Sequence, residues 1–293
     1  MPKSRADASR ANKSKRSARR AGSEALAAEN PKNTVNSVSK AFSVLRAFSA
    51  ERPTMTLSEV AEATEMDRGT VFRLLHTLRS LGYLRQEDGK RFRLGLKCLE
   101  LGFVALSSHE LWFHAAPFLR ECVPTVVDAA SLGVLDGPDV MFVHRFDDGF
   151  RRQDIDRRPG RRIRAYGSAL GHVLLAWLPE EKQIEILNSA ARIRLSERTL
   201  TDLDLLVQRL REVRTNGYAV SDGENAFGLR TIAVPIFRNT DVVIAGISLT
   251  VDSERMSIED LVASALPRAR AISDELSNAL RVAAGLIDVR QTK

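Results

Sequence analysis

The sequence has very little cysteine, and its two cysteines do not form a recognisable site. Cys98 and Cys122 lie far apart, with no CxxC pair and no histidine at metal-ligand spacing around them. This absence excludes the usual disulfide frameworks and zinc sites, whose ligands come in closely spaced pairs. We therefore expect no bound metal, no cofactor and a reducing compartment.

Long apolar runs are also absent. The strongest ones, Val173–Leu178 and Val242–Ile247, are far shorter than the roughly 20 residues that span a bilayer. Basic residues come first in the chain, yet the apolar stretch of a secretory signal does not follow them. These two absences lead us to expect a cytoplasmic protein with no membrane contacts.

Net charge is absent outside the N-terminal tail. The whole chain carries +7, from 44 basic and 37 acidic residues, and residues 1–20 hold eight of the basic residues and one acid. The tail thus accounts for 8 − 1 = +7, and the remainder balances at 36 and 36. Residues 1–33 contain almost no large apolar side chains, so they cannot offset the entropy lost on ordering. We predict a disordered basic tail that adds only sequence-independent attraction to phosphates.

The sequence contains none of the common catalytic motifs. It has no glycine-rich phosphate loop, and His114 comes one residue too late after His109 for the paired histidines of a zinc-protease helix. Ser168 lacks the glycine two positions earlier that a hydrolase elbow uses, because Tyr166 stands there. We expect no enzyme and no catalytic residues. A small-molecule enzyme with an appended DNA-binding module stays open as the alternative.

A dense pattern of short helices and a hairpin follows the tail. Apolar spacing predicts helices from Ser37 to about Ala50, from Leu57 to about Thr64 and from Arg68 to about Leu81. Thr56 and Glu59 have the spacing of a capping box, and the very short turn after this second helix forces a steep helix crossing. Tyr83–Gln86 and Arg91–Leu94 flank a turn that contains Gly89, which predicts a wing. Residues 34–95 are thus predicted to form a winged helix-turn-helix domain.

The third helix presents polar side chains opposite its apolar side, as a recognition helix does. Arginine can present a fork to guanine or phosphate, glycine lets the backbone approach closely, and threonine can contact a thymine methyl group. The residues concerned are Arg68, Gly69, Thr70 and Arg73, with Lys90 and Arg91 at the wing tip. A solvated surface is the alternative, but residues 34–108 hold 11 basic and 8 acidic residues in an otherwise neutral body. We expect these six residues to bind double-stranded DNA.

Beyond the wing, apolar residues at helical spacing predict a linker helix over residues 96–112. From 113 to 290 the pattern becomes mixed. We expect strands at Ser131–Leu135, Val140–Val143, Thr231–Phe237 and Val242–Val251, and helices near Ala169–Trp177, Glu181–Asn188, Leu203–Asn216 and Ile258–Arg281. Strands mixed with helices in this way are typical of an α+β domain.

Eight short motifs are distributed between about Val35 and Leu280. In the first half they are Val38-x-x-Ala41-x-x-Val44-Leu45, Leu57-x-x-Val60-Ala61, Thr70-Val71-x-Arg73-Leu74-Leu75-x-x-Leu78 and Leu81-Gly82-Tyr83-Leu84. In the second half they are Leu132-Gly133-Val134-Leu135-Asp136-Gly137, Ala169-Leu170-Gly171-His172-Val173-Leu174-Leu175-Ala176, Asn216-Gly217-Tyr218-Ala219 and Gly228-Leu229-Arg230-Thr231-Ile232-Ala233-Val234-Pro235. Together they resemble the IclR family of bacterial transcription regulators. The last motif is most similar to the subgroup that regulates protocatechuate, 4-hydroxybenzoate and β-ketoadipate genes.

The resemblance implies a winged helix, a linker helix and a GAF-like effector-binding domain, acting as a homodimer or dimer of dimers on palindromic operators. Because one winged helix covers too little DNA to select an operator in a genome, dimerisation is also expected on energetic grounds. A small organic acid, either an aromatic acid or a keto or dicarboxylic acid of catabolism, would change operator affinity or the recruitment of RNA polymerase. The sequence thus predicts an acid-controlled, sequence-specific transcription regulator.

The resemblance also places a small carboxylate effector between the sheet and the start of a helix. Carried over by alignment, the pocket residues are Ala169, Thr231, Ser248 and Thr250. Ser168 is expected to cap the helix and leave nearby amides facing an anion. Asp222, with Ser221 and Glu224, lies in a loop that could close the pocket, although a turn-forming role for Asp222 is equally open. Ser131 on an early strand is a further candidate.

A run of arginines from Arg151 to Arg164 sets this chain apart, since Arg164 stands where the family usually has proline. Aspartates interleave with these arginines, which favours a surface loop. Arg162 is the expected exception, because it aligns with a basic position that is common in the subgroup. We therefore expect Arg162 to supply a positive charge to the effector.

Overall fold

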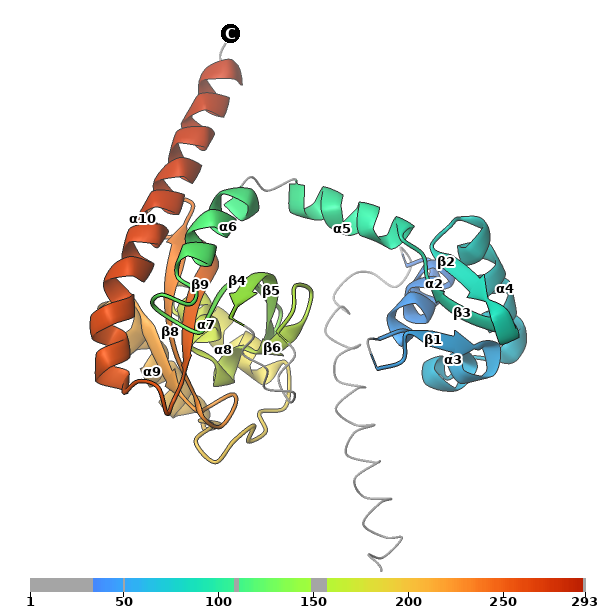
Figure 1. The fold of residues 1–293 in the computed structure, drawn as a ribbon, viewed down its shortest axis with the longest axis horizontal. Coiled ribbons are helices and arrows are strands. Elements are labelled where there is room, and N and C mark those ends of the chain that lie inside the picture. The colour runs from blue at the N-terminus through green and yellow to red at the C-terminus, as the bar shows by residue number, and fades with distance from the viewer. Residues whose placement is uncertain (1–33, 50, 108–110, 149–156, 292–293) are drawn as a thin grey trace, which may run out of the picture. The chain divides into compact units, whose positions relative to one another are not determined.

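The computed structural model describes residues 34–49, 51–107, 111–148 and 157–291. The chain divides into two compact units, with the boundary between His109 and Glu110 (Figure 1). The predicted basic tail, 1–33, and the first part of the arginine run, residues 151–156, lie outside the described residues.

The N-terminal unit is a winged helix-turn-helix, as the sequence predicts. Its elements are α2 (Asn36–Ala47), β1 (Thr54–Thr56), α3 (Leu57–Thr64), α4 (Arg68–Ser80), β2 (Leu84–Glu87) and β3 (Arg91–Leu94). The strands pair antiparallel in the order β1-β3-β2, and apolar side chains such as Val44, Val60, Leu75 and Phe92 share one core. The sequence does not predict β1, because three residues carry too little alternation to indicate a strand.

Side-chain caps fix the start of α3 and of α4. Thr56 donates its backbone N–H to Glu59 Oε2 at 2.6 Å, and Glu59 returns one to Thr56 Oγ1 at 3.3 Å, which confirms the predicted capping box. Asp67 Oδ1 accepts the backbone N–H of Thr70 at 2.8 Å, and the hydrogen bonds from Thr70 lower the pKa of this carboxyl. Between the helices Glu65 is left-handed, with φ at 54°, which turns the chain into α4.

The C-terminal unit is built on an antiparallel sheet with the order β6-β5-β4-β9-β8-β7 in the part of the chain that the structure describes. Its strands are β4 (Ala129–Asp136), β5 (Asp139–Asp147), β6 (Arg162–Arg164), β7 (Ala219–Asp222), β8 (Leu229–Phe237) and β9 (Val243–Asp252). The long strands β4, β5, β8 and β9 confirm the predicted ones. Short β6 and β7 extend the two edges and are not predicted.

Helices cover both faces of this sheet. They are α6 (Leu111–Glu121), α7 (Ala169–Leu175), α8 (Glu180–Asn188), α9 (Leu203–Asn216) and α10 (Ile258–Gln291). α10 and α6 pack together against β8, β9, β4 and β5, whereas α7, backed by α9 and α8, packs on the opposite face (Figure 1). None of the described helices carries an apolar stretch long enough to cross a membrane.

The predicted linker helix is shorter than the sequence suggests. Helix α5 (Lys97–Ser107) ends before residues 108–110, which lie outside the described residues, and α6 begins at Leu111. Leu111 and Trp112 are buried in the C-terminal unit, and Pro117 lies inside α6. The apolar repeat of residues 96–112 therefore combines the surface of one helix with the core of another.

Glycines let α7 lie unusually close to the sheet. Gly133 and Gly246 face each other across β4 and β9, and a Cβ on either would lie 2.8 Å from a Leu170 methyl group. On α7 itself, a Cβ at Gly171 would overlap the backbone of Ala165 in the preceding turn. These contacts fix the start of α7 over the middle of the sheet, beside the cavity described below.

Candidate DNA-binding face and effector pocket

The start of α4 carries the predicted DNA contacts on its exposed side. Arg68, Gly69 and Arg73 are exposed, and Thr70 is half-buried beneath its cap. Arg68 donates from Nη2 to Ser58 Oγ of α3 at 2.9 Å, so this guanidinium is oriented across the turn between the two helices. The resulting surface offers guanidinium donors and an approachable backbone, which are the groups that read DNA.

An exposed aromatic side chain on the same helix is not among the predicted contacts. Phe72 is 51% exposed, and its ring centroid lies 4.3 Å from that of His76 one turn later. An apolar ring in this place suits contact with a thymine methyl group. The sequence pattern that could have indicated Phe72 as a DNA contact is its position opposite the apolar side of α4.

The wing residues do not both face outward. Lys90 is exposed at the tip, with a left-handed φ of 60°. Arg91 instead donates to the hydroxyl and carbonyl oxygens of Thr54 at 3.0 and 2.9 Å and pairs with Glu59 at 3.1 Å. The placement of Arg91 therefore favours a role in fastening the wing to β1 and the capping box, rather than the predicted contact with DNA.

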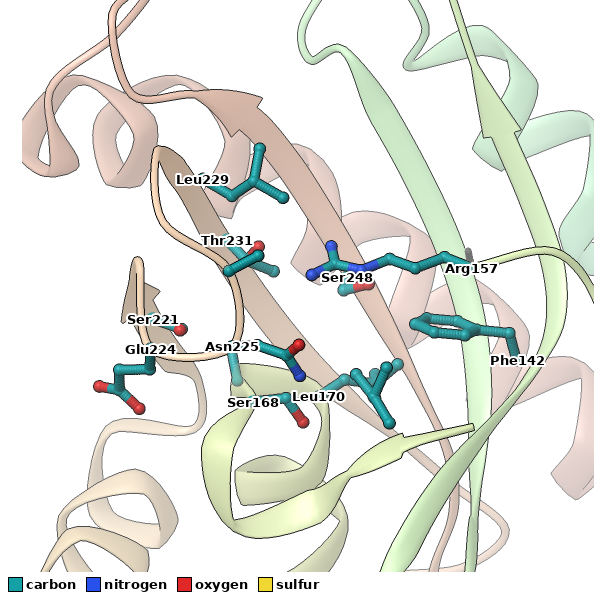
Figure 2. Close-up of a pocket in the computed structure, with 13 residues that line it drawn as sticks. Phe142, Arg157, Ser168, Leu170, Ser221, Glu224, Asn225, Leu229, Thr231 and Ser248 are labelled. Atoms are coloured by element: carbon teal, nitrogen blue, oxygen red, sulfur yellow. The ribbon is translucent and has the colours of Figure 1, made fainter. Parts of the chain in front are cut away.

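A cavity lies between the sheet, the start of α7 and the loop 223–228 (Figure 2). It is lined by Phe142, Arg157, Ile163, Ser168, Ala169, Leu170, Ser221, Glu224, Asn225, Ala226, Leu229, Thr231 and Ser248. Only about 20 Å³ of it is open to the centre of a water molecule, which is room for roughly one ordered water. A larger molecule can enter only if the loop or side chains move.

The structure brings four predicted effector residues together around this cavity: Ser168, Ala169, Thr231 and Ser248. Ser168 caps α7 as predicted, because its Oγ accepts the backbone N–H of Gly171 at 3.1 Å. Thr250 is buried behind the lining, and its hydroxyl lies 3.0 Å from that of Thr231. Ser221 and Glu224, named with the loop, also line the cavity.

Two other predicted effector residues lie outside the cavity. Asp222 pairs with Arg230 at 3.0 Å and with Arg198, so its placement fits the structural alternative. Arg162 is half-exposed on β6 and pairs with Asp136 through contacts of 2.7 and 2.5 Å. Because this partner already neutralises Arg162, the structure offers no support for its predicted contact with the effector. Arg164, the replacement for proline, likewise pairs with Asp139 at 3.0 Å.

Arg157, unlike Arg162, belongs to the cavity lining. Its side chain is 7% exposed, and its guanidinium points across the cavity towards Thr231 and Ser248 (Figure 2). Burial, with a smaller contribution from Arg145, lowers the pKa of Arg157 to about 10. The sequence could not single out Arg157, because it stands among similar arginines between Arg151 and Arg164.

A bulge in the sheet brings Arg145 to the same face. The pairing of β4 with β5 shifts between Leu132 and Gly133, so that the extra residue in β5 reverses the alternation of its side chains. Arg145 then lies opposite Ser131 and donates to its hydroxyl at 3.1 Å. Ser131 is thereby engaged with Arg145 and is not part of the cavity lining.

The loop 223–228 closes one side of the cavity. Thr199 Oγ1 donates to the Glu224 carbonyl oxygen at 2.6 Å, and Arg209 pairs with the Glu224 carboxylate at 3.1 Å. Arg230, at the other end of the loop, donates to the carbonyl oxygens of Ser253 and Met256 at 2.8 and 2.7 Å. These bonds connect the cavity wall to the residues just before α10.

His172 on α7 is a core residue and not a catalytic base. It is fully buried, its Nε2 lies 2.7 Å from the Tyr166 carbonyl oxygen, and burial lowers its pKa. A neutral ring that donates through Nε2 satisfies this geometry.

Family models match both units of the chain. The model for the "IclR helix-turn-helix domain" matches residues 37–88, and the model for "Bacterial transcriptional regulator IclR C-terminal" matches residues 103–278, more than half of the chain. The chain belongs to the IclR family of bacterial transcription regulators. Both units of the fold agree with this assignment.

Relatives of this IclR-family protein are similar over most of their length. The regulator KdgR of Escherichia coli is 35% identical over 83% of this chain and 94% of its own. The Pca regulon regulatory protein of Pseudomonas putida is 32% identical over 84% of both chains. An IclR homologue from Microbacterium hydrocarbonoxydans, crystallised with 4-hydroxybenzoate, has a TM-score of 0.74 and 25% identity over 84% of this chain and 99% of its own. Because KdgR and Pca regulators both match, the subgroup is not settled.

Membership of the IclR family indicates a DNA-binding transcription regulator and not an enzyme. Among the residues that the structure describes, no three His, Cys, Asp or Glu side chains form a group that could hold a metal ion. His109, one of the two histidines considered for a zinc-protease helix, lies outside the described residues.

Proposed function

We propose that a small organic acid controls this regulator by binding in the cavity under the loop 223–228. The observation that carries the proposal is the set of hydroxyl groups from Ser168, Ser221, Thr231 and Ser248 that converge there beside an apolar wall. Cavities of this kind, apolar with a few convergent polar groups, are the usual sites for small ligands. The homologue crystallised with 4-hydroxybenzoate supports an aromatic monocarboxylate as one candidate.

The small size of the cavity supports a mechanism of control. An acid larger than water must displace the loop 223–228, which Glu224 ties to Arg209 and Thr199. Displacement would also act on Arg230, and through its bonds to Ser253 and Met256 on the start of α10. A ligand that fits one arrangement better than the other shifts the population between them.

We propose that the protein reads its operator as a homodimer or a dimer of dimers. Arg68, Gly69, Thr70 and Arg73 would enter the major groove, with Lys90 of the wing near the backbone. Helix α5 and the residue before it support pairing between copies, because the apolar side chains of Leu96, Leu99 and Val104 are 70%, 67% and 66% exposed. A regulator that binds operator DNA would act in the cytoplasm. There the effector would change the affinity of the protein for its operator, or the protein's recruitment of RNA polymerase.

The proposal is tested by fluorescence anisotropy on DNA from upstream of the protein's own gene, at fixed moderate salt. We expect specific binding whose Kd changes when 4-hydroxybenzoate, protocatechuate, pyruvate or succinate is added. Equal affinity for upstream and random DNA would overturn the regulator model. Specific binding that none of these acids changes would overturn the effector class.

A further inference from the structure

Arg157 is a buried cation that has no negative partner among the residues the structure describes. It is 7% exposed, and its Nε lies buried without a hydrogen-bond acceptor. Described arginines nearby are paired: Arg162 with Asp136, and Arg164 with Asp139. Burying a charge without a partner is costly, so a protein retains such a residue where something else compensates it.

The neighbours of Arg157 add positive charge and do not remove it. Arg145, whose positive charge helps to lower the pKa of Arg157, is almost as deeply buried and pairs with Asp147 at 3.2 Å. The carboxylate among the described lining residues is Glu224, which pairs with Arg209 at 3.1 Å and points away from Arg157 (Figure 2). Among the residues that the structure describes, this end of the cavity therefore holds one uncompensated positive charge.

A second unpaired donor lies on the loop. Asn225 Nδ2 is buried without an acceptor, and its side chain points into the cavity from the side opposite Arg157 (Figure 2). Two N–H donors without acceptors, together with the hydroxyl groups of Ser248 and Thr231, suit a group that accepts several hydrogen bonds. A carboxylate is such a group, and its charge also suits a guanidinium.

We propose that Arg157 is the residue that binds the carboxylate of the effector, with Asn225 donating a second hydrogen bond. This assignment rests on the proposed function and adds the place of the acid group. The carboxylate lies at the Arg157 end, not at the start of α7, where Ser168 already accepts the Gly171 N–H. The rest of the acid lies against Phe142, Ile163 and Leu170. The ligand class is therefore a small acid, bound as its anion and rejected when neutral.

The ligand-free protein provides the first test. Arg157→Met removes an uncompensated buried charge and keeps a similar length of apolar chain. We expect its melting temperature to equal that of the unmodified protein or exceed it by about 2–4 °C. Arg157→Lys is a second variant, which keeps the positive charge. Arg162→Gln is the matched control on the neighbouring strand β6. A fall of more than about 5 °C in Arg157→Met, with no fall in Arg162→Gln, would show that Arg157 is structural and overturn the assignment.

The second test pairs each acid with its neutral amide. Thermal shifts are measured at constant ionic strength with 4-hydroxybenzoate and 4-hydroxybenzamide, and with pyruvate, succinate and their amides. We expect at least one acid to raise the melting temperature by about 4 °C or more near saturation, and its amide to have no effect. Arg157→Met should weaken that acid at least about tenfold in Kd, with Arg157→Lys intermediate and Arg162→Gln unchanged.

The outcomes separate the two proposals. If an acid and its amide stabilise the protein equally, or if Arg157→Met keeps the full response, the assignment of Arg157 is wrong while the effector pocket stands. If no acid stabilises the unmodified protein, the effector class fails and the assignment fails with it.

Discussion

At the scale of single residues, the proposed DNA-binding face and effector pocket each depend on the surroundings of one arginine. On α4, Arg73 is exposed and its charge helps to lower the pKa of Asp67, whereas Arg68 is oriented by a hydrogen bond to Ser58. In the C-terminal unit, Arg157 differs from Arg162 and Arg164, because each of those two arginines has a carboxylate partner. At both sites the partners of an arginine, more than its presence, indicate its role.

Replacing Arg73 by alanine should weaken specific DNA binding by about 10- to 100-fold, since a bidentate contact to a base contributes about 1–3 kcal/mol. Arg79→Ala is the matched control, because Arg79 lies at the other end of α4 and is engaged with Gln86. Anisotropy titrations on specific and random DNA measure the effect. A loss of the same size for Arg79→Ala would contradict the assigned face of α4.

The candidate site could be predicted from the sequence only in part. Ser168, Ala169, Thr231 and Ser248 meet as expected, because each lies in or directly beside a helix or strand that the sequence predicts. Arg157 could not be distinguished, since burial of one arginine in a run of similar residues is decided by tertiary contacts. The contacts of Arg91 with Thr54 could not be predicted for the same reason, because Thr54 lies on β1, a strand that the sequence does not indicate.

At the scale of elements, the close approach of α7 to the sheet sets the geometry of the cavity. The long strands and helices could be predicted, because their apolar residues repeat over many positions. The short strands β1, β6 and β7 could not, because three or four residues give no period and their pairing depends on neighbours distant in the sequence. The split between α5 and α6 was hidden by one continuous apolar repeat.

The space around two helical glycines predicts opposite effects of alanine substitution on stability. Gly171→Ala should lower the stability of the C-terminal unit by about 1–3 kcal/mol, because the new methyl group overlaps the backbone of Ala165. Gly102→Ala in α5 should be neutral or stabilising by up to about 1 kcal/mol, because nothing lies near its Cβ position. Urea unfolding followed by circular dichroism measures both. Equal stability of the Gly171→Ala variant would contradict the close contact.

At the scale of the whole molecule, we expect the charge of the N-terminal tail to attract any DNA and the residues of the DNA-binding unit to select the operator sequence. The +7 of the chain equals the charge of its first twenty residues, while the described DNA-binding unit carries only a small excess. Deleting residues 1–30 should weaken binding to every DNA and flatten its dependence on salt, because fewer counterions are released. The order of preference among sequences should stay the same. Titrations at several salt concentrations measure this, and a lost preference would show that the tail takes part in selection.

The central claim is that an acid in the cavity changes operator affinity, and the most direct measurement is the operator Kd with and without the acid that stabilises the protein. The comparison includes Thr231→Val, which keeps the side-chain shape but removes a hydroxyl group from the cavity wall. We predict that the acid changes the Kd of the unmodified protein at least about fivefold. Thr231→Val should bind the operator normally without acid and respond at least about fivefold less sensitively to it. An unchanged response in Thr231→Val, or an acid that binds without changing the operator Kd, would contradict the account.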